Sequence, residues 1–219
     1  MKARLKASYD AIADKYNAHF TSSDDPVRLK YLQVLLSQLQ TDDQQRATVL
    51  ELGCGAGVPA TRRLLEIASP VIHVTGNDLS TSQLDLARKN LADFEDRLTL
   101  VEGDMLALKF PDQTFNAVTG FYSIIHLPRE EQTQLLRRIA AWLKPDGLLL
   151  ANFAVEESKV VVQEKWLGED KGWMHWSSWG EQGSAKMIED AGLKIIFTET
   201  KQVGGDANFV WLLAKKTGF

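Results

Sequence analysis

The sequence predicts an α/β protein with a doubly wound, mostly parallel seven-stranded sheet, helices on both faces and a C-terminal antiparallel hairpin. Three observations favour this class. Short apolar runs alternate with helical patterns of about 10–15 residues, a glycine cluster follows the first run, and two strand-like runs stand close together near the end. Alternating strands and helices imply right-handed crossovers between parallel strands, whereas strands joined by a short connection pair antiparallel.

Residues 1–45 are expected to form an N-terminal helical cap. The segment 2–18 carries apolar residues at helical spacing, beginning with Leu5. A polar break follows it, and Pro26 suits the first position of a second helix over 27–39.

Residues 46–154 are expected to form the ligand-binding core. Its strands are β-branched or apolar and end at turn residues, and its helices begin near Ser, Thr or Pro. The predicted strands are 46–52, 71–78, 98–104, 115–122 and 148–155, and the predicted helices are 59–68, 81–94 and 128–143.

The C-terminal part departs from this alternation. Residues 155–180 are too long for a bare connection and hold four of the six tryptophans, so we expect an insertion that acts as a lid. Residues 181–219 are expected to complete the same single domain. They read as a helix that Gly192 closes and as strands 193–202 and 208–216, joined by the short VGGDA connection.

Composition excludes several function classes. The formal charge of −4 and the lack of a basic face argue against a nucleic-acid partner. Cys54 is the only cysteine, which leaves no internal disulfide and no multi-thiolate metal site and favours the reducing cytoplasm. No apolar run approaches the roughly 20 residues that cross a membrane, and the N-terminus lacks a signal-like apolar region. We therefore expect a cytoplasmic protein that binds neither a membrane nor nucleic acid and has no metal site. We expect it to be a monomer or a homodimer.

The most informative stretch is VLELGCGAGVPATRRL at 49–64. Glycines there follow a strand and open a helix, so the backbone turns sharply and its N–H groups can approach a ligand. A dinucleotide fingerprint would need a glycine at Val58. Glu51 stands two positions before the first glycine, where it disfavours a pyrophosphate and favours a ligand that carries an ammonium and a sulfonium.

Two further acids follow the next strands. Asp78 ends the second strand, where a carboxylate can accept both hydroxyls of a ribose. Asp104 and Met105 follow the third, where they could accept from an exocyclic adenine amine and pack against its ring. A helix cap at Asp78 and an ordinary turn at Asp104 are the structural alternatives.

Taken in order, ELGCGAG, GNDLS, EGDM, FNAVTGFYSIIHLP and LKPDGLLL resemble the motifs of class I S-adenosylmethionine-dependent methyltransferases. The resemblance covers roughly residues 46–154, and YDAIADKY is similar to the N-terminal helix of small-molecule members. It implies S-adenosyl-L-methionine as cofactor and S-adenosyl-L-homocysteine as product. The cofactor-binding residues that it implies are Glu51, Gly53, Cys54, Gly55, Gly57, Asp78, Leu79, Asp104, Met105, Gly120 and Phe121.

Candidates for the acceptor site come from residue chemistry and place in the chain. His126 follows the fourth strand and could act as a general base, or it could anchor the next helix. Tyr16 could contact cofactor or substrate from the first helix. Trp173, His175 and Trp176 could wall a substrate pocket, or could form a satellite core or a dimer surface.

The predicted function is methyl transfer to a small organic acceptor by in-line displacement, with oxygen or nitrogen as the expected nucleophile. A nicotinamide-dependent oxidoreductase and a non-catalytic methyltransferase-like binding protein are the alternatives. The sequence identifies neither the acceptor nor the oligomeric state.

Overall fold

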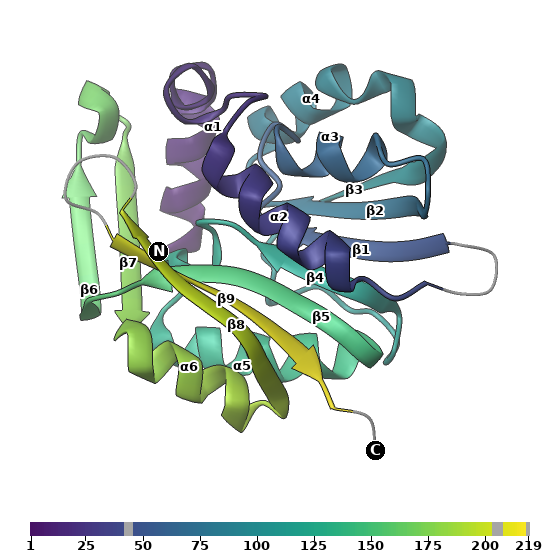
Figure 1. Ribbon diagram of the computed structural model, residues 1–219. Helices are drawn as coiled ribbons and strands as arrows, with labels where there is room; N and C mark the ends of the chain where they lie inside the picture. Colours follow the sequence, from purple (N-terminus) through teal and green to yellow (C-terminus); the bar gives the residue numbers. More distant parts are fainter. Residues whose placement is uncertain (42–45, 203–207, 218–219) are drawn as a thin grey trace.

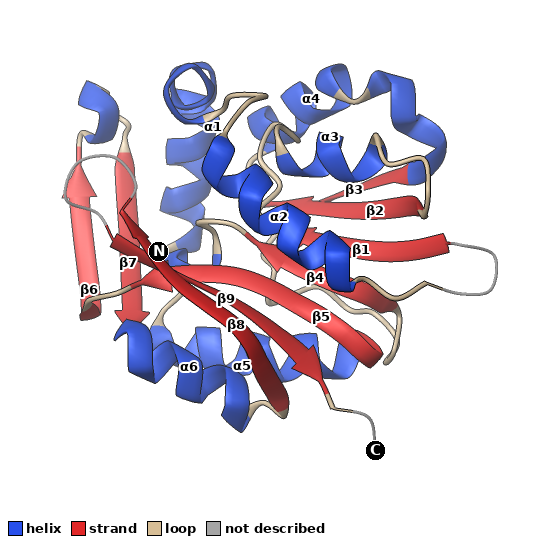
Figure 2. Cartoon of the chain, in the orientation of Figure 1, coloured by secondary structure: helices blue, strands red, loops and turns tan. Residues whose placement is uncertain are grey.

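The computed structural model describes residues 1–41, 46–202 and 208–217 of the chain. Its centre is a seven-stranded sheet in the order β3-β2-β1-β4-β5-β9-β8 (Figure 2). The first five strands run parallel, and β9 pairs antiparallel with both β5 and β8. The strands are β1 (Arg46–Leu52), β2 (Val71–Asp78), β3 (Leu98–Glu102), β4 (Phe115–Gly120), β5 (Leu143–Ala154), β8 (Leu193–Gln202) and β9 (Asn208–Lys216).

Helices cover both faces of this sheet (Figure 1). Successive strand residues alternate between the two faces, so Val49 packs with the α2–α3 layer and Leu50 with the α5–α6 layer. The helices are α1 (Lys2–Phe20), α2 (Pro26–Gln38), α3 (Ala60–Leu65), α4 (Thr81–Asn90), α5 (Arg129–Trp142) and α6 (Gly180–Asp190). The predicted fold class, with a parallel sheet and a C-terminal antiparallel hairpin at its edge, is confirmed.

The order of the strands reverses between β1 and β4. Strand β1 pairs with β2 on one side and β4 on the other, so the crossovers leave in opposite directions. Ligands of open α/β sheets bind at such a switch point, outside the carboxyl ends of the strands. The fold therefore places the glycine turn after β1 at the expected position.

Several boundaries differ from the sequence-based ones. The bounds of β1 and β2 agree with the predictions, but β3 and β4 end two residues earlier, at Glu102 and Gly120. Strand β5 begins five residues earlier than predicted because the expected turn is absorbed into it as an irregularity, with Asp146 at φ 63°. The predicted VGGDA connection lies outside the described residues.

Helix α1 and residues 155–180 meet at the carboxyl edge of the sheet. Helix α2 belongs to the helical layer, whereas α1 stands between α4 and a separate two-stranded hairpin (Figure 1). That hairpin, formed by β6 (Glu157–Glu164) and β7 (Trp173–Trp179), is what occupies the predicted insertion. In the described ranges, no helix is both long and apolar enough for a membrane span.

Candidate functional site

The turn after β1 is shaped by glycines at positions that other residues could not occupy. Gly53 has φ +72°, and a Cβ there would lie 2.4 Å from the Cβ of Ser123. Gly55 has φ +54°, and within 4 Å a Cβ would meet only Gln83 Oε1, at 3.7 Å. Both glycines line a cavity of about 90 Å³. The space at Gly55 is therefore left open toward this cavity, where a ligand could approach the backbone.

Asp78, at the end of β2, is tied to this turn. Its Oδ2 accepts a hydrogen bond from the backbone N–H of Gly55 at 2.9 Å, and its Oδ1 accepts from that of Ser80 at 2.8 Å. Burial raises the pKa of Asp78 above its ordinary value. The carboxylate lines the cavity together with Leu79, and its remaining lone pairs can accept from a ligand's hydroxyls.

Asp104 follows β3 and lines the same cavity with Met105. Its Oδ2 accepts from the Lys2 ammonium of α1 at 2.7 Å, and Lys2 also pairs with Glu131 at 2.7 Å. The carboxylate expected to meet an adenine amine is thus paired with a cation of the chain itself. We call Gly53, Gly55, Asp78 and Asp104 the glycine-turn side of the cavity.

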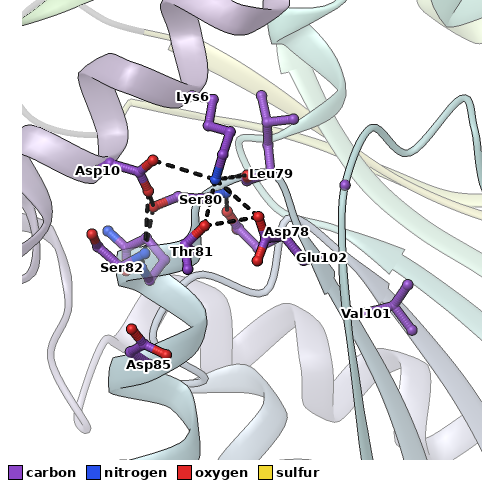
Figure 3. A network of polar contacts seen from close by, with 12 residues as sticks. Lys6, Asp10, Asp78, Leu79, Ser80, Thr81, Ser82, Asp85, Val101 and Glu102 are labelled. Atoms are coloured by element: carbon purple, nitrogen blue, oxygen red, sulfur yellow. Dashed lines mark hydrogen bonds and ion pairs between the residues drawn. The ribbon is translucent and has the colours of Figure 1, made fainter.

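A polar network fastens α1 over the ends of β2 and β3 (Figure 3). Lys6 reaches from α1 to Glu102 at 3.0 Å and to the Thr81 hydroxyl at 2.5 Å. Asp10, one turn further along the helix, accepts from the Ser80 hydroxyl at 2.7 Å. These contacts hold α1, which contributes Tyr9 and Tyr16 to the cavity lining, against the ends of β2 and β3.

Glu51 lies behind the glycine turn and is not among the cavity-lining residues. Its carboxylate accepts from the Thr61 hydroxyl at 2.5 Å, and burial raises its pKa to about 7. The charge of Arg28 opposes that shift. Arg28, which sequence reasoning did not single out, also places its guanidinium 4.8 Å from the ring centre of cavity-lining Tyr122.

Three further predicted residues support the turn by packing and do not line the cavity. The Cys54 sulfur lies 3.0 Å from where a Cβ on Gly76 would stand, so Cys54 fills the space beside β2. A Cβ on Gly57 would approach the Leu91 side chain to 2.5 Å, and one on Gly120 would meet a side chain at 2.9 Å. These positions keep the helices close to the strand ends.

The other side of the cavity is aromatic. We call Tyr9, Tyr16, Phe121, Tyr122 and His126 the aromatic side, and all five line the cavity. The charged residues that line the cavity, by contrast, are Lys2, Asp78 and Asp104. The cavity therefore joins a charged, backbone-rich side to an uncharged aromatic side.

His126 is held in one tautomer. Its Nδ1 donates to the backbone oxygen of His175 at 2.8 Å, and the Nδ1 of His175 donates back to the backbone oxygen of His126 at 3.1 Å. The Nε2 of His126 therefore accepts from the Tyr9 hydroxyl at 2.9 Å. Burial lowers the pKa of His126 to about 4. The imidazole is neutral at physiological pH and can accept a proton at Nε2.

The predicted substrate residues of the hairpin stand apart from the cavity lining. Trp173 packs against Leu5 and Ile12 of α1, and its backbone N–H donates to the Ser8 hydroxyl at 2.7 Å. His175 exchanges two hydrogen bonds with His126, each from a ring nitrogen to a backbone oxygen. The centroid of the Trp176 ring lies 6.0 Å from that of the His126 ring.

Sequence reasoning missed Lys2. Only its position on α1, not any local motif, brings it to Asp104. Across the residues that the structure describes, no group of three or more His, Cys, Asp or Glu side chains could hold a metal ion.

The central part of the chain is similar to known methyltransferases. Residues 49–147 match the family model described as "Methyltransferase domain". The chain is 34% identical over 113 residues to the 27-O-demethylrifamycin SV methyltransferase of Amycolatopsis mediterranei (strain S699), which covers 50% of this chain and 40% of that protein. The chain spans less than half the length of the first curated relatives it matches.

Solved structures match along almost the whole chain. The 1,6-didemethyltoxoflavin-N1-methyltransferase of Burkholderia thailandensis, with bound 1,6-didemethyltoxoflavin and S-adenosylhomocysteine, has a TM-score of 0.74 at 18% identity, and the match covers 99% of this chain and 88% of that one. The [4+2]-cyclase SpnF has a TM-score of 0.74 at 17% identity, with 99% and 97% coverage. Likeness at these identities shows a shared fold, and the second protein carries a different activity on it.

Proposed function

We propose that the chain is a class I S-adenosylmethionine-dependent methyltransferase that transfers a methyl group from this cofactor to a small organic acceptor, and its match to the methyltransferase family model and to a relative named as a methyltransferase supports this. The observation that carries the proposal is the convergence of Gly55, Asp78 and Asp104 on one cavity at the switch point of the sheet. Each comes from a different strand end, and each offers what one part of the cofactor needs.

The residues present fit the cofactor. Gly55 leaves space beside backbone N–H groups for the methionine portion, and Asp78 has lone pairs for the ribose hydroxyls. Asp104 and Met105 would frame the adenine, and Leu79 and Phe121 would supply apolar contacts. The buried Glu51 carboxylate would stabilise the positive charge of the methionine amino group from behind the turn.

The cavity must enlarge for this to happen. Its volume of about 90 Å³ is well below the roughly 300 Å³ of the smallest ordinary ligand pockets. Helix α1 lines the cavity and is tied to the strand ends through Lys2 and Lys6, so we propose that α1 shifts and that Lys2 leaves Asp104 when the cofactor enters.

The cofactor, when bound, supplies an electrophilic methyl group on a cationic sulfur. The chain's own contribution is to orient the acceptor and to take its proton. His126 Nε2, neutral and held by the His175 carbonyl, would accept that proton, with Tyr9 as its hydrogen-bond partner until the acceptor arrives. Tyr16, Phe121 and Tyr122 would keep the surroundings dry. An acceptor with a hydroxyl or amine nucleophile suits this arrangement.

An acceptor screen that measures S-adenosylhomocysteine release tests the proposal. The protein is incubated with S-adenosylmethionine and a panel of phenols, alcohols and amines, beside the Asp78→Ala variant as the inactive control. Release that depends on an acceptor and disappears in the variant supports methyl transfer. Tight binding of the cofactor with no release for any acceptor would favour a non-catalytic role.

A further inference from the structure

Trp166 stands at the tip of the β6–β7 hairpin and closes the aromatic side from outside. Its ring is stacked on that of Phe20, with centroids 5.6 Å apart and an interplanar angle of 2°. The ring centroids of Tyr16, Trp176 and Tyr9 lie at 5.8, 6.0 and 6.3 Å. Trp166 therefore packs against Tyr9 and Tyr16, the two α1 rings that line the cavity.

The backbone around Trp166 is held in an unfavourable conformation. Lys165 and Leu167 flank it with φ values of 52° and 57°, which residues other than glycine rarely adopt. The Trp166 N–H donates to the Gly172 carbonyl at 3.0 Å, and a Cβ on Gly172 would lie 2.3 Å from the Trp166 carbonyl oxygen. Such strain persists only where surrounding structure fixes it, and it is typical of functional positions. The turn thus aims the indole at α1.

Ion pairs hold the hairpin against α1 on both sides of this turn. Arg4 of α1 pairs with Glu164 at 2.5 Å, and Lys15 pairs with Glu169 at 2.9 Å. In Figure 1 the hairpin runs beside α1 along the edge of the molecule. The indole, α1 and hairpin consequently form one wall.

The chemistry of this wall selects for a particular kind of acceptor. Its rings offer faces and edges for stacking, and the charged lining residues lie on the glycine-turn side. Ring faces can also attract a cation, but the sulfonium expected beside them would repel one. A neutral planar ring is the acceptor that satisfies both conditions.

From these contacts we infer that Trp166 forms the outer wall of the acceptor compartment and sets the size of the neutral, planar ring that the compartment takes. This inference rests on the proposed function, because it presumes that the cofactor fills the glycine-turn side. Trp173 lies on the same hairpin but packs on Leu5, Ile12 and Met174, so it provides a matched control.

The test is a binding measurement on protein loaded with sinefungin, a stable cofactor analogue that keeps a positive charge in place of the sulfonium. Dissociation constants for phenol, 1-naphthol and benzyltrimethylammonium are measured by calorimetry or ligand-observed NMR. The variants are Trp166→Ala, Trp166→Phe and Trp173→Phe. Removing an aromatic side chain can leave a cavity that takes up a small ring. We therefore expect Trp166→Ala to shift the preference toward 1-naphthol over phenol by at least about fivefold.

Trp166→Phe should shift the preference less and in the same direction, which keeps the test valid if the alanine variant does not fold. Trp173→Phe should leave the preference for 1-naphthol over phenol within about twofold of the parent's. An unchanged preference in both Trp166 variants, or an equal shift in Trp173→Phe, would overturn the role of Trp166. Tighter binding of the cation than of 1-naphthol would overturn the neutral acceptor class. Failure of sinefungin itself to bind would instead count against the proposed function.

Discussion

The glycine-turn side and the aromatic side of the cavity are built in different ways. On the glycine-turn side, strand ends and backbone groups dominate, and the bond from Gly55 to Asp78 links neighbouring strands of one parallel sheet. On the aromatic side, the contacts join distant parts of the chain. Tyr9 is 117 residues from His126 in sequence, and His126 is 49 residues from His175.

This difference indicates how the two sides can vary. The glycine-turn side depends on the geometry of the sheet, so a substitution there disturbs the fold and the ligand together. The aromatic side combines residues that follow β4 with rings of α1, and α1 packs against a hairpin that lies outside the main sheet. The first side suits a constant cofactor, and the second can change with the acceptor. The following predictions test that division.

The largest effect is expected at His126. In His126→Gln the side chain cannot accept a full proton, so turnover of the acceptor found in the screen should fall by about 100-fold or more. S-adenosylhomocysteine affinity, measured by calorimetry, should stay within about twofold because the ring belongs to the aromatic side. His19→Gln changes an exposed histidine of α1 and should leave both values unchanged. Equal losses of turnover and affinity in His126→Gln would break the division between the sides.

Asp78 should contribute most to the affinity for S-adenosylhomocysteine. Asp78→Ala removes hydrogen bonds to a charged group, each of which contributes about 1.5–3 kcal/mol, so S-adenosylhomocysteine should bind at least about 50-fold more weakly. Asp85→Ala changes an exposed acid of α4 that pairs with Arg88 and should bind normally. Normal affinity in Asp78→Ala would show that the ligand lies elsewhere.

Glu51 should give the glycine-turn side a pH dependence. Its pKa is about 7 in the folded protein, above the ordinary value of 4.5 for a glutamate, because burial disfavours the charged form. The folded state therefore keeps a proton that the unfolded chain releases between pH 4.5 and 7, and the free energy of unfolding falls as pH rises through this window. At pH 8, Glu51→Gln should be more stable by about 1–3 kcal/mol in urea unfolding.

In the same variant, the affinity for S-adenosylhomocysteine should no longer depend on pH. Ionised Glu51 favours the ligand's ammonium, so affinity for S-adenosylhomocysteine should rise between pH 6 and 8 in the parent and should stay flat in Glu51→Gln. Glu66→Gln, which changes a half-exposed acid near Arg62, should behave like the parent. A parallel rise in affinity in both variants would assign the titration to another group.

Lys2 should give the smallest effect. Its ion pair with Asp104 is 28% exposed on both partners, and such pairs contribute about 0.2–1 kcal/mol. Lys2→Met should therefore tighten S-adenosylhomocysteine binding by up to about fivefold at low salt, and added salt should reduce the difference from the parent. Lys186→Met, on α6, should show neither effect. Weaker binding in Lys2→Met would mean that Lys2 holds the ligand instead of competing with it.

Sequence alone predicted the fold and most of the glycine-turn side because both depend on local patterns. The bounds of β1 and β2 follow from their apolar runs, and the glycine turn and Asp78 follow directly after them. The aromatic side could be predicted only in part. His126 and Tyr16 were recognised as candidates, but nothing local shows that the Tyr9 hydroxyl bonds to His126 or that His175 holds its ring.

The hairpin was the hardest part to predict. Its length and tryptophan content indicated an insertion, but its strand register and the position of Trp166 depend on packing against α1. Likewise, the pairing of Lys2 with Asp104 spans 102 residues and has no sequence signal.

A crystal structure of the protein with S-adenosylhomocysteine would test the central claim most directly. The account predicts the ribose hydroxyls on the Asp78 carboxylate, the adenine beside Met105 with Lys2 withdrawn from Asp104, and the sulfur turned toward His126. A ligand bound away from the glycine turn, or an Asp78 carboxylate without contact to the sugar, would contradict it.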